Sequence, residues 1–272
     1  MTTTTVRIAA RQGSGRYGLL LWQLWLPVVA FVLVWVISAG STSFYFPPAS
    51  RVAEVTVNTW FWEGIRTEMV PSLVRLVIGY GLAVVVGVAL GVALGILRPL
   101  ESATRPVVET VRAVPGVALL PIAMMFFGTG EVMKITMIAF ISLWPIFLNT
   151  VEGVRSIDPT LTSVVRVYRL SPFATFRFVY LPAALPQIFA GARIALAIAV
   201  AVMVAVEMFG TPGGLGYFIR NAQQTFRIAE MWSGLLMLGI FGYLLNIAFR
   251  LLEHRVLRWN YRRIAHLKGS SQ

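Results

Sequence analysis

Long apolar segments recur along the chain, and polar or basic residues separate each one from the next. A helix of about 20 mostly apolar residues can cross the roughly 30 Å hydrocarbon core of a bilayer. Six segments are close to this length and carry few or no charges, namely residues 19–40, 76–97, 107–127, 132–151, 187–209 and 231–249. The pattern predicts an all-α, polytopic membrane protein with six transmembrane helices.

The first apolar segment follows three arginines, as the apolar core of a cleaved signal peptide would. Its apolar run is longer than the core of a usual signal peptide, and Trp22, Trp25 and Trp35 are typical of anchors at a membrane interface. We therefore expect an uncleaved helix, preceded by a cytoplasmic tail over residues 1–18.

Residues 41–70 mix charged and aromatic side chains and contain no apolar run long enough to span a membrane. We expect an external loop with an amphipathic helix near the interface. The next apolar segment carries Gly87, Gly91 and Gly95, which share one helix face because they are four residues apart. This spacing favours close packing against another helix. A pore lining is the alternative.

The third apolar segment contains Pro115 and Pro121. Proline removes a backbone hydrogen bond, so it kinks or breaks a helix inside a membrane. We expect residues 98–106 to form a short loop before this segment and residues 128–131 to form a tight turn after it.

A basic, interrupted segment over residues 163–186 lies between two very apolar ones. Ser171 suits the N-cap of a helix, and Pro172 suits the first helical position, where its missing N–H has no partner to lose. Leu181-Pro182 is expected to end that helix. The order predicts a helix, a turn, a second helix and a stop.

Composition supports the membrane assignment, since 57% of the residues are hydrophobic, 12% are charged and the mean hydropathy is +0.77. These values lie outside the range of ordinary soluble domains. A net charge of +12 is also found in nucleic-acid-binding proteins. Here, however, the basic residues lie at the ends of apolar segments, where they set topology. We therefore expect a lipid bilayer and no nucleic acid as partner.

The distribution of basic residues predicts the orientation. Six spans place both termini on one side, and that side holds most of the Lys and Arg residues. The opposite side holds only Arg51, Arg66, Lys134, Arg220 and Arg227. Because cytoplasmic loops carry the excess of basic residues, both termini and the connection over residues 158–185 are predicted to be cytoplasmic. A transmembrane domain over residues 19–255 would then precede a basic cytoplasmic tail over residues 256–272.

Catalytic residue sets are scarce. The chain has no cysteine, and its only histidines, His254 and His266, lie in the basic C-terminal region. No Ser-His dyad, His-based metal site or phosphate-binding glycine loop followed by lysine can be assembled inside the spans. We expect no enzyme activity and no cofactor or metal in this chain, so any ATP chemistry would belong to another subunit.

Ionisable residues inside membrane spans are costly and are therefore functional candidates. Glu207, with Met203 one turn before it, is a candidate for lining or gating a pathway, and the alternatives are an interhelical ion pair or a carboxylate that faces the membrane interface. Arg112 could meet an anionic solute, but a pair with Glu109 is favoured. Arg193 is expected to anchor its helix at the inner face.

The longest predicted cytoplasmic connection, residues 152–185, combines three phenylalanines and three arginines: Phe173, Phe176, Phe178, Arg166, Arg169 and Arg177. Exposed aromatic residues and arginines are typical of interface anchors. Composition alone equally permits a solvated loop whose arginines only set topology.

A resemblance favours the docking interpretation. Residues 163–182 resemble the cytoplasmic EAA loop of binding-protein-dependent ABC importer permeases, whose pattern is Glu-Ala-Ala, three residues, Gly, nine residues, Ile, one residue, Leu-Pro. In this alignment, Ser163-Val164-Val165 takes the Glu-Ala-Ala place, Arg169 the glycine place and Val179 the isoleucine place, and Leu181-Pro182 matches. Ser163 and Arg169 therefore depart from the pattern.

The flanking sequence is similar to the nitrate, sulfonate and taurine importer subfamily. This similarity covers roughly residues 44–255 and includes Phe46-Pro47-Pro48, residues 114–135, Asp158-Pro159 and residues 181–210. The resemblance implies a type I ABC importer permease fold. In that family the loop is the coupling helix that sits in a groove of the ATPase subunit. The coupling residues would here be Ser163, Val164, Val165, Arg166, Arg169, Ser171, Pro172, Phe173, Phe176, Arg177, Leu181 and Pro182.

The resemblance also implies partners and a location. The chain would work in the bacterial cytoplasmic (inner) membrane with two ATPase subunits that bind ATP and Mg, a second permease copy or a non-identical permease, and an extracytoplasmic substrate-binding protein. The solute would be a small anion such as nitrate, a sulfonate, taurine or bicarbonate. The alternative function is a stand-alone oligomeric channel or secondary carrier, and a membrane enzyme ranks third.

Overall fold

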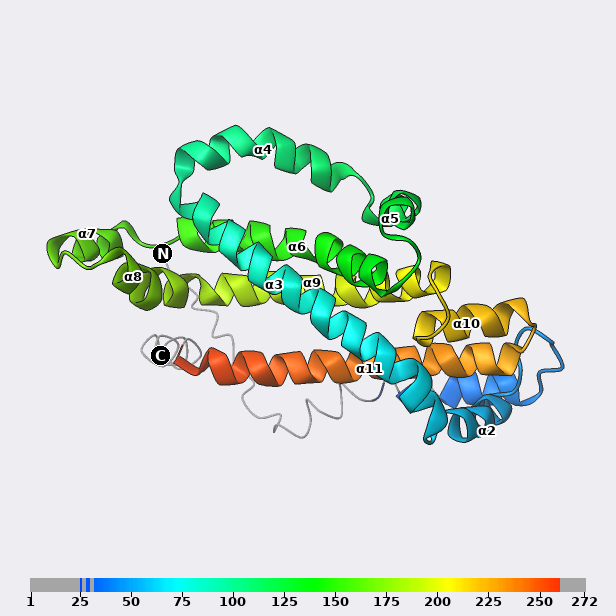
Figure 1. The fold of residues 1–272 in the computed structure, drawn as a ribbon. Coiled ribbons are helices and arrows are strands. Elements are labelled where there is room, and N and C mark those ends of the chain that lie inside the picture. The colour runs from blue at the N-terminus through cyan, green and yellow to red at the C-terminus, as the bar shows by residue number, and fades with distance from the viewer. Residues whose placement is uncertain (1–24, 26–27, 30–31, 260–272) are drawn as a thin grey trace, which may run out of the picture.

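The computed structural model describes residues 25, 28–29 and 32–259, and these form helices, turns and loops without a strand. Four long helices build the bundle: α3 (Val70–Ile96), α6 (Glu131–Arg155), α9 (Leu181–Phe209) and α11 (Ile228–Val256). Each lies in a helical run long and apolar enough to cross a membrane. In Figure 1, α3 crosses α6 and α9, and α11 runs along the lower edge of the bundle. The predicted all-α membrane fold is confirmed.

Small residues bring α3 close to α6. A Cβ atom added at Gly91 would lie 2.5 Å from the Cβ of Thr150, and one added at Gly95 would lie 2.7 Å from the Cβ of Val154. Gly87 faces Ile146 in the same way, at 3.1 Å. The glycine face is therefore a helix-packing surface, as small residues spaced by four permit, and the pore-lining alternative is wrong for these three positions.

The region of the predicted third span is not one straight helix. α4 (Arg98–Ala113) is followed by a 3-10 turn over Gly116–Leu119 and by α5 (Leu120–Phe127), and the two parts are bent by 82°. The break comes before Pro115, where Val114 is extended with ψ of 123°, as expected of a residue that precedes proline. The predicted loop over residues 98–106 is wrong because these residues belong to α4.

Counting the bent pair as one span gives five candidate spans in the described residues. The predicted first span, residues 19–40, lies mostly outside them, and only its last part, residues 32–39, is described as a continuous helix. The predictions on the tail over residues 1–18 and on most of the C-terminal tail also fall outside the described residues.

The predicted amphipathic helix before the second span is present as α2 (Ala49–Trp60). It is held to the bundle by Trp60, whose indole donates a hydrogen bond to Ser233 of α11 at 3.3 Å and packs edge-on against Phe218. Phe218 belongs to α10 (Leu215–Gln224). A π-helical turn over Ile65–Met69 then leads into α3, so the second span begins earlier than predicted. In Figure 1, α2 and α10 lie at the same end of the bundle, opposite α7 and α8.

The basic segment forms α7 (Pro159–Val167), a turn, α8 (Pro172–Thr175) and a π-helical turn over Phe176–Tyr180 that runs into α9. The predicted stop at Leu181-Pro182 is wrong, because one helical run extends over Phe173–Phe209. Pro182 lies in the first turn of α9, directly after the π-helical turn. The altered hydrogen-bond register of that turn accommodates the proline.

Candidate functional site

Polar side chains begin both short helices of the loop that contains α7 and α8. Asp158 accepts a hydrogen bond from the backbone N–H of Thr160 at 2.7 Å. Hydrogen bonds from the Thr160 side chain and backbone hold the pKa of Asp158 below its usual value. The hydroxyl of Ser171 accepts a hydrogen bond from the N–H of Ala174 at 3.2 Å, which confirms the predicted N-cap.

The turn between α7 and α8 contains Arg169 in the left-handed region, with φ of 49°. The N–H of the next residue, Leu170, reaches back to the carbonyl of Val165 at 3.2 Å and closes the end of α7. A left-handed residue after a helix is usually glycine, because a side chain is strained there. Arg169 thus occupies a position whose backbone favours glycine, and the resemblance assigns glycine to that same place.

The three phenylalanines of this loop are not equivalent. Phe173 is 75% exposed and Phe178 is 71% exposed. Phe176 instead packs, with Leu181, against a buried cluster formed by Val92, Val154, Ala184 and Ile188. The expectation that all three are exposed interface anchors is wrong for Phe176, whose side chain packs against the apolar core. Phe173 is the exposed aromatic side chain at the start of the long helical run.

The remaining predicted loop residues divide by exposure. Ser163, Arg169, Ser171 and Arg177 are exposed, and Val165 and Pro182 are half-buried. The guanidinium of Arg177 lies 5.7 Å from the ring centre of Phe178. The side chains of Val164, Arg166 and Pro172 lie outside what the structure describes.

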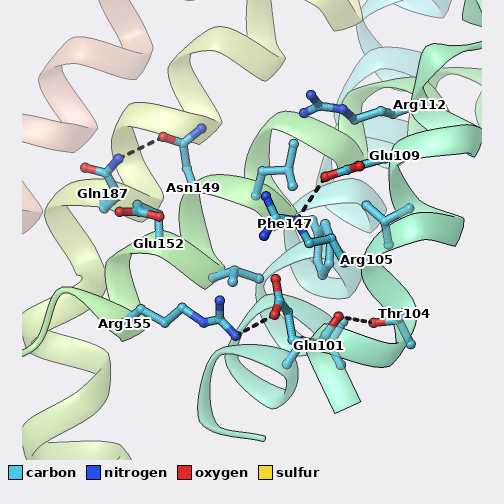
Figure 2. Close-up of a pocket in the computed structure, with 14 residues that line it drawn as sticks. Glu101, Thr104, Arg105, Glu109, Arg112, Phe147, Asn149, Glu152, Arg155 and Gln187 are labelled. Atoms are coloured by element: carbon cyan, nitrogen blue, oxygen red, sulfur yellow. Dashed lines mark hydrogen bonds and ion pairs between the residues drawn. The ribbon is translucent and has the colours of Figure 1, made fainter. Parts of the chain in front are cut away.

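A polar chamber of about 470 Å³ lies between α4, the C-terminal part of α6 and the start of α9 (Figure 2). Two ion pairs line it: Arg105 to Glu109 at 3.0 Å and Arg155 to Glu101 at 2.9 Å. On the α6 and α9 side, Gln187 donates a hydrogen bond to Asn149 at 3.0 Å.

A second chamber of about 640 Å³ adjoins the first, near the break between α4 and α5, and is more apolar, with Phe140, Ile141 and Trp144 in its wall. Glu109, Arg112 and Leu148 line both chambers. The predicted pair of Arg112 with Glu109 is wrong, because Glu109 binds Arg105. Figure 2 shows the Arg112 side chain extending from α4 over the polar chamber.

The opposite end of the bundle holds a buried charge cluster centred on Arg75 of α3. Arg75 binds Glu131 of α6 through two hydrogen bonds, of 2.6 and 2.7 Å, and Glu207 of α9 through one of 2.8 Å. Ser72 also donates to Glu207, at 2.7 Å. Glu207 is fully buried and takes part in the interhelical ion pair that was one alternative to a gate. Met203 is buried in the adjacent apolar core.

The turn that follows α9 is bound to this cluster. Arg75 donates to the carbonyl of Gly213 at 2.9 Å, and the N–H of Gly216 donates to Glu207 at 3.0 Å. Gly214 has φ of 108°, and a Cβ atom there would lie 2.4 Å from the carboxylate of Glu207. Lys134 of α6 adds a hydrogen bond to the carbonyl of Thr211 at 2.9 Å. Glycine at 214 is therefore required both by the backbone conformation and by the close approach of the cluster.

Sequence reasoning missed Arg75, Glu131, Ser72 and Lys134. The only available signal was that a carboxylate within a span needs a partner, and Arg75 stands at the edge of the predicted second span. The structure adds a partner for Arg193, which forms an ion pair with Glu253 of α11. Within the described part of the chain, no group of three His, Asp or Glu residues could hold a metal ion.

Comparisons with known proteins agree with this geometry. Residues 83–259 match the family model of the binding-protein-dependent transport system inner membrane component. The chain is 30% identical over 266 residues to the putative aliphatic sulfonates transport permease protein SsuC of Bacillus subtilis, a match that covers 94% of each chain. It is also 30% identical to the bicarbonate transport system permease protein CmpB of Synechococcus elongatus, covering 93% of this chain and 99% of that one.

A third relative, the nitrate import permease protein NrtB of Synechocystis, is 31% identical and covers 85% of this chain and 87% of its own. Among solved structures, a chain from inward-facing conformations of the MetNI methionine ABC transporter superposes with a TM-score of 0.64 at 23% identity. That match covers 73% of this chain and 98% of the other. At this identity the structural match concerns the fold.

Proposed function

Because this chain belongs to the family of binding-protein-dependent transport system inner membrane components, we propose that it forms the translocation pathway of an ABC importer for a small anion. As a permease of that family it is a multi-pass inner-membrane protein, and its relatives are transporters rather than enzymes. The solute would be delivered by an extracytoplasmic binding protein, and ATP would be bound by a separate ATPase subunit.

The observation that carries the proposal is the continuous helical run over Phe173–Phe209. At about 1.5 Å per residue, 37 residues span about 55 Å. One end presents exposed Phe173, and the other end carries Glu207 in the buried charge cluster. A force applied at the α7–α8 loop would therefore reach the opposite end of the bundle through one rigid element, as alternating access requires.

The orientation follows from the basic residues. With the α7–α8 loop in the cytoplasm, Arg166, Arg169 and Arg177 lie on the side where positive charge is favoured. The exposed face of that loop would sit on the ATPase subunit, with Phe173 as its aromatic anchor. The turn after α9 and helices α2 and α10 would then face outward, where the binding protein docks.

The anionic solute class is supported by the relatives, whose names specify aliphatic sulfonates, bicarbonate and nitrate. The two chambers beside α4 offer a route for it, since Arg112 lines both of them. Glu207 and Met203 are proposed to act at the outer end of the pathway. Both are buried against neighbouring helices in this conformation, so their role would be to hold the outer end closed.

Assembly is proposed to follow the family, with two permease chains and two ATPase subunits. Ser163 and Arg169, which depart from the family pattern, leave open whether the second permease is identical. Purification through a tagged ATPase subunit tests this point. Two copies of this chain in the complex would support a homodimer, and a second kind of permease would support a heteromeric transporter.

Uptake into proteoliposomes tests the function. The permease is reconstituted with its ATPase subunit and binding protein, and the entry of nitrate, bicarbonate and taurine is measured with and without ATP. We expect ATP-dependent entry of at least one of these solutes, which stops when the ATPase subunit carries an inactivating substitution. Entry that continues with the inactive ATPase would instead support a channel or secondary carrier.

A further inference from the structure

Arg112 differs from the other arginines that line the polar chamber. Arg105 and Arg155 are neutralised by Glu109 and Glu101. No ion pair or hydrogen bond involves Arg112 among the described residues, although it stands where the polar chamber meets the apolar one. A guanidinium is always charged and carries five N–H donors. Arg112 is exposed in the wall shared by the two chambers, so its guanidinium is open to an anion that enters either one.

The wall opposite α4 supplies neutral donors. The amide nitrogen of Gln187 uses one N–H on Asn149, and the amide nitrogen of Asn149 uses one on the carbonyl of Pro145. Each side-chain amide nitrogen has two N–H groups, so each retains a second one. Figure 2 shows both amides in the same chamber as Arg112.

One carboxylate, that of Glu109, shares the junction of the two chambers with Arg112. Glu101 and Glu109 are bound by arginines. Glu152 lies almost one turn beyond Asn149 on α6, toward α7. The junction lined by Arg112 therefore carries one positive charge without an acidic partner among the described residues, while Asn149 and Gln187 supply amide donors across the polar chamber, beside Glu152 (Figure 2).

We propose that Arg112, assisted by Asn149 and Gln187, contacts a small monovalent oxyanion as it passes from the apolar chamber to the polar one. This inference rests on the proposed function, because it names the residue through which that pathway selects negative charge. Arg112 would lower the barrier for an anion at the junction of the two chambers and raise it for a cation. The pair of chambers is large enough for nitrate, bicarbonate or a short sulfonate.

The chain contains no cysteine, so a single introduced thiol can probe the junction without background. Leu148 lines both chambers and is partly exposed, which makes Leu148→Cys a suitable reporter. Its rate of labelling is measured with a negatively charged and a positively charged methanethiosulfonate of similar size, in phosphatidylcholine nanodiscs. We expect the negative reagent to label faster than the positive one. Arg112→Gln should lower the ratio of the two labelling rates about tenfold, as the loss of a nearby unit charge at low dielectric implies.

Two variants serve as matched controls. Arg112→Lys keeps the positive charge at residue 112, and Arg250→Gln removes a positive charge from α11, outside both chambers. Both should retain the preference of the Leu148→Cys protein. A preference unchanged by Arg112→Gln would overturn the proposal. Added nitrate, bicarbonate or methanesulfonate should slow labelling only when Arg112 is present. Slowing by phosphatidylglycerol and by none of the three soluble anions would assign the site to a lipid headgroup and overturn the solute contact.

Transport separates this inference from the proposed function. In the reconstituted importer, Arg112→Gln should reduce anion uptake about tenfold while ATP hydrolysis stimulated by the binding protein persists, and Arg112→Lys should restore uptake. Full uptake by Arg112→Gln would contradict the anion contact alone. If the unsubstituted complex shows no ATP-dependent uptake, the proposed function fails, whereas the labelling preference still tests the site.

Discussion

The guanidinium of Arg75 lies 2.8 Å from the carboxylate of Glu207, and the two residues are 132 positions apart in the sequence. Both side chains are buried, with 6% and 0% of their surfaces exposed. Arg75 also binds Glu131 and the carbonyl of Gly213. One residue of α3 thus joins α6, α9 and the turn after α9, so this end of the bundle depends on this contact.

Replacing Glu207 by alanine should destabilise the protein by about 3 kcal/mol or more, because removal of one partner leaves buried donors of Arg75 and Ser72 without their acceptor. The change is measured as a fall in the thermal unfolding temperature in detergent. Arg105→Gln is the control, since its pair with Glu109 is exposed and such pairs contribute little to stability. Equal effects of the two substitutions would contradict the structural role of the cluster.

Adding a methyl group at Gly91 should separate α3 from α6. The new Cβ would lie 2.5 Å from Thr150 and 2.9 Å from the carbonyl of Phe147, so backbone would have to move. We expect Gly91→Ala to cost about 1 to 3 kcal/mol by overpacking. Gly81→Ala on the same helix meets nothing within 4 Å and should be neutral or slightly stabilising. A thermal unfolding series that ranks them in the opposite order would refute the packing of these two helices.

Arg169→Gly should stabilise the α7–α8 turn relative to Arg169→Ala, by about 1 kcal/mol, because glycine adopts positive φ without steric cost and alanine does not. Both substitutions remove the same charge, so their difference isolates the backbone effect. Hydrogen exchange of the amides in residues 165–175 measures it, with slower exchange expected for glycine. Equal protection in the two variants would show that residue 169 is not left-handed in solution.

Much of the bundle could be predicted from local patterns. Apolar length identified the helices that became α3, α6, α9 and α11, and the spacing of glycines identified the face that α3 buries. The cap at Ser171 was predictable because it uses a partner three residues away. These features depend on neighbours in the sequence, which is why periodicity and capping rules find them.

Other features depend on distant parts of the chain and were not predictable in this way. The partner of Glu207 is Arg75 on another helix, and no local sequence pattern around either residue identifies the other as its partner. The first part of α4, residues 98–106, was taken for a loop because Pro99 and Pro106 suggested breaks, yet Pro99 falls in the first turn of the helix, where proline is tolerated. The continuity of Phe173–Phe209 through Pro182 depends on the π-helical turn, which has no clear sequence signature.

The central claim is that ATPase subunits drive this permease through the α7–α8 loop, and Phe173 tests it most directly because its side chain is exposed and outside the apolar core. The measurement compares ATP-dependent anion uptake and ATP hydrolysis in proteoliposomes for Phe173→Asp and for Phe173→Leu, which keeps an apolar anchor. We predict that Phe173→Asp inserts and folds but loses uptake and its coupling to hydrolysis, whereas Phe173→Leu retains both. Uptake by Phe173→Asp at the rate of the unsubstituted protein would contradict the account.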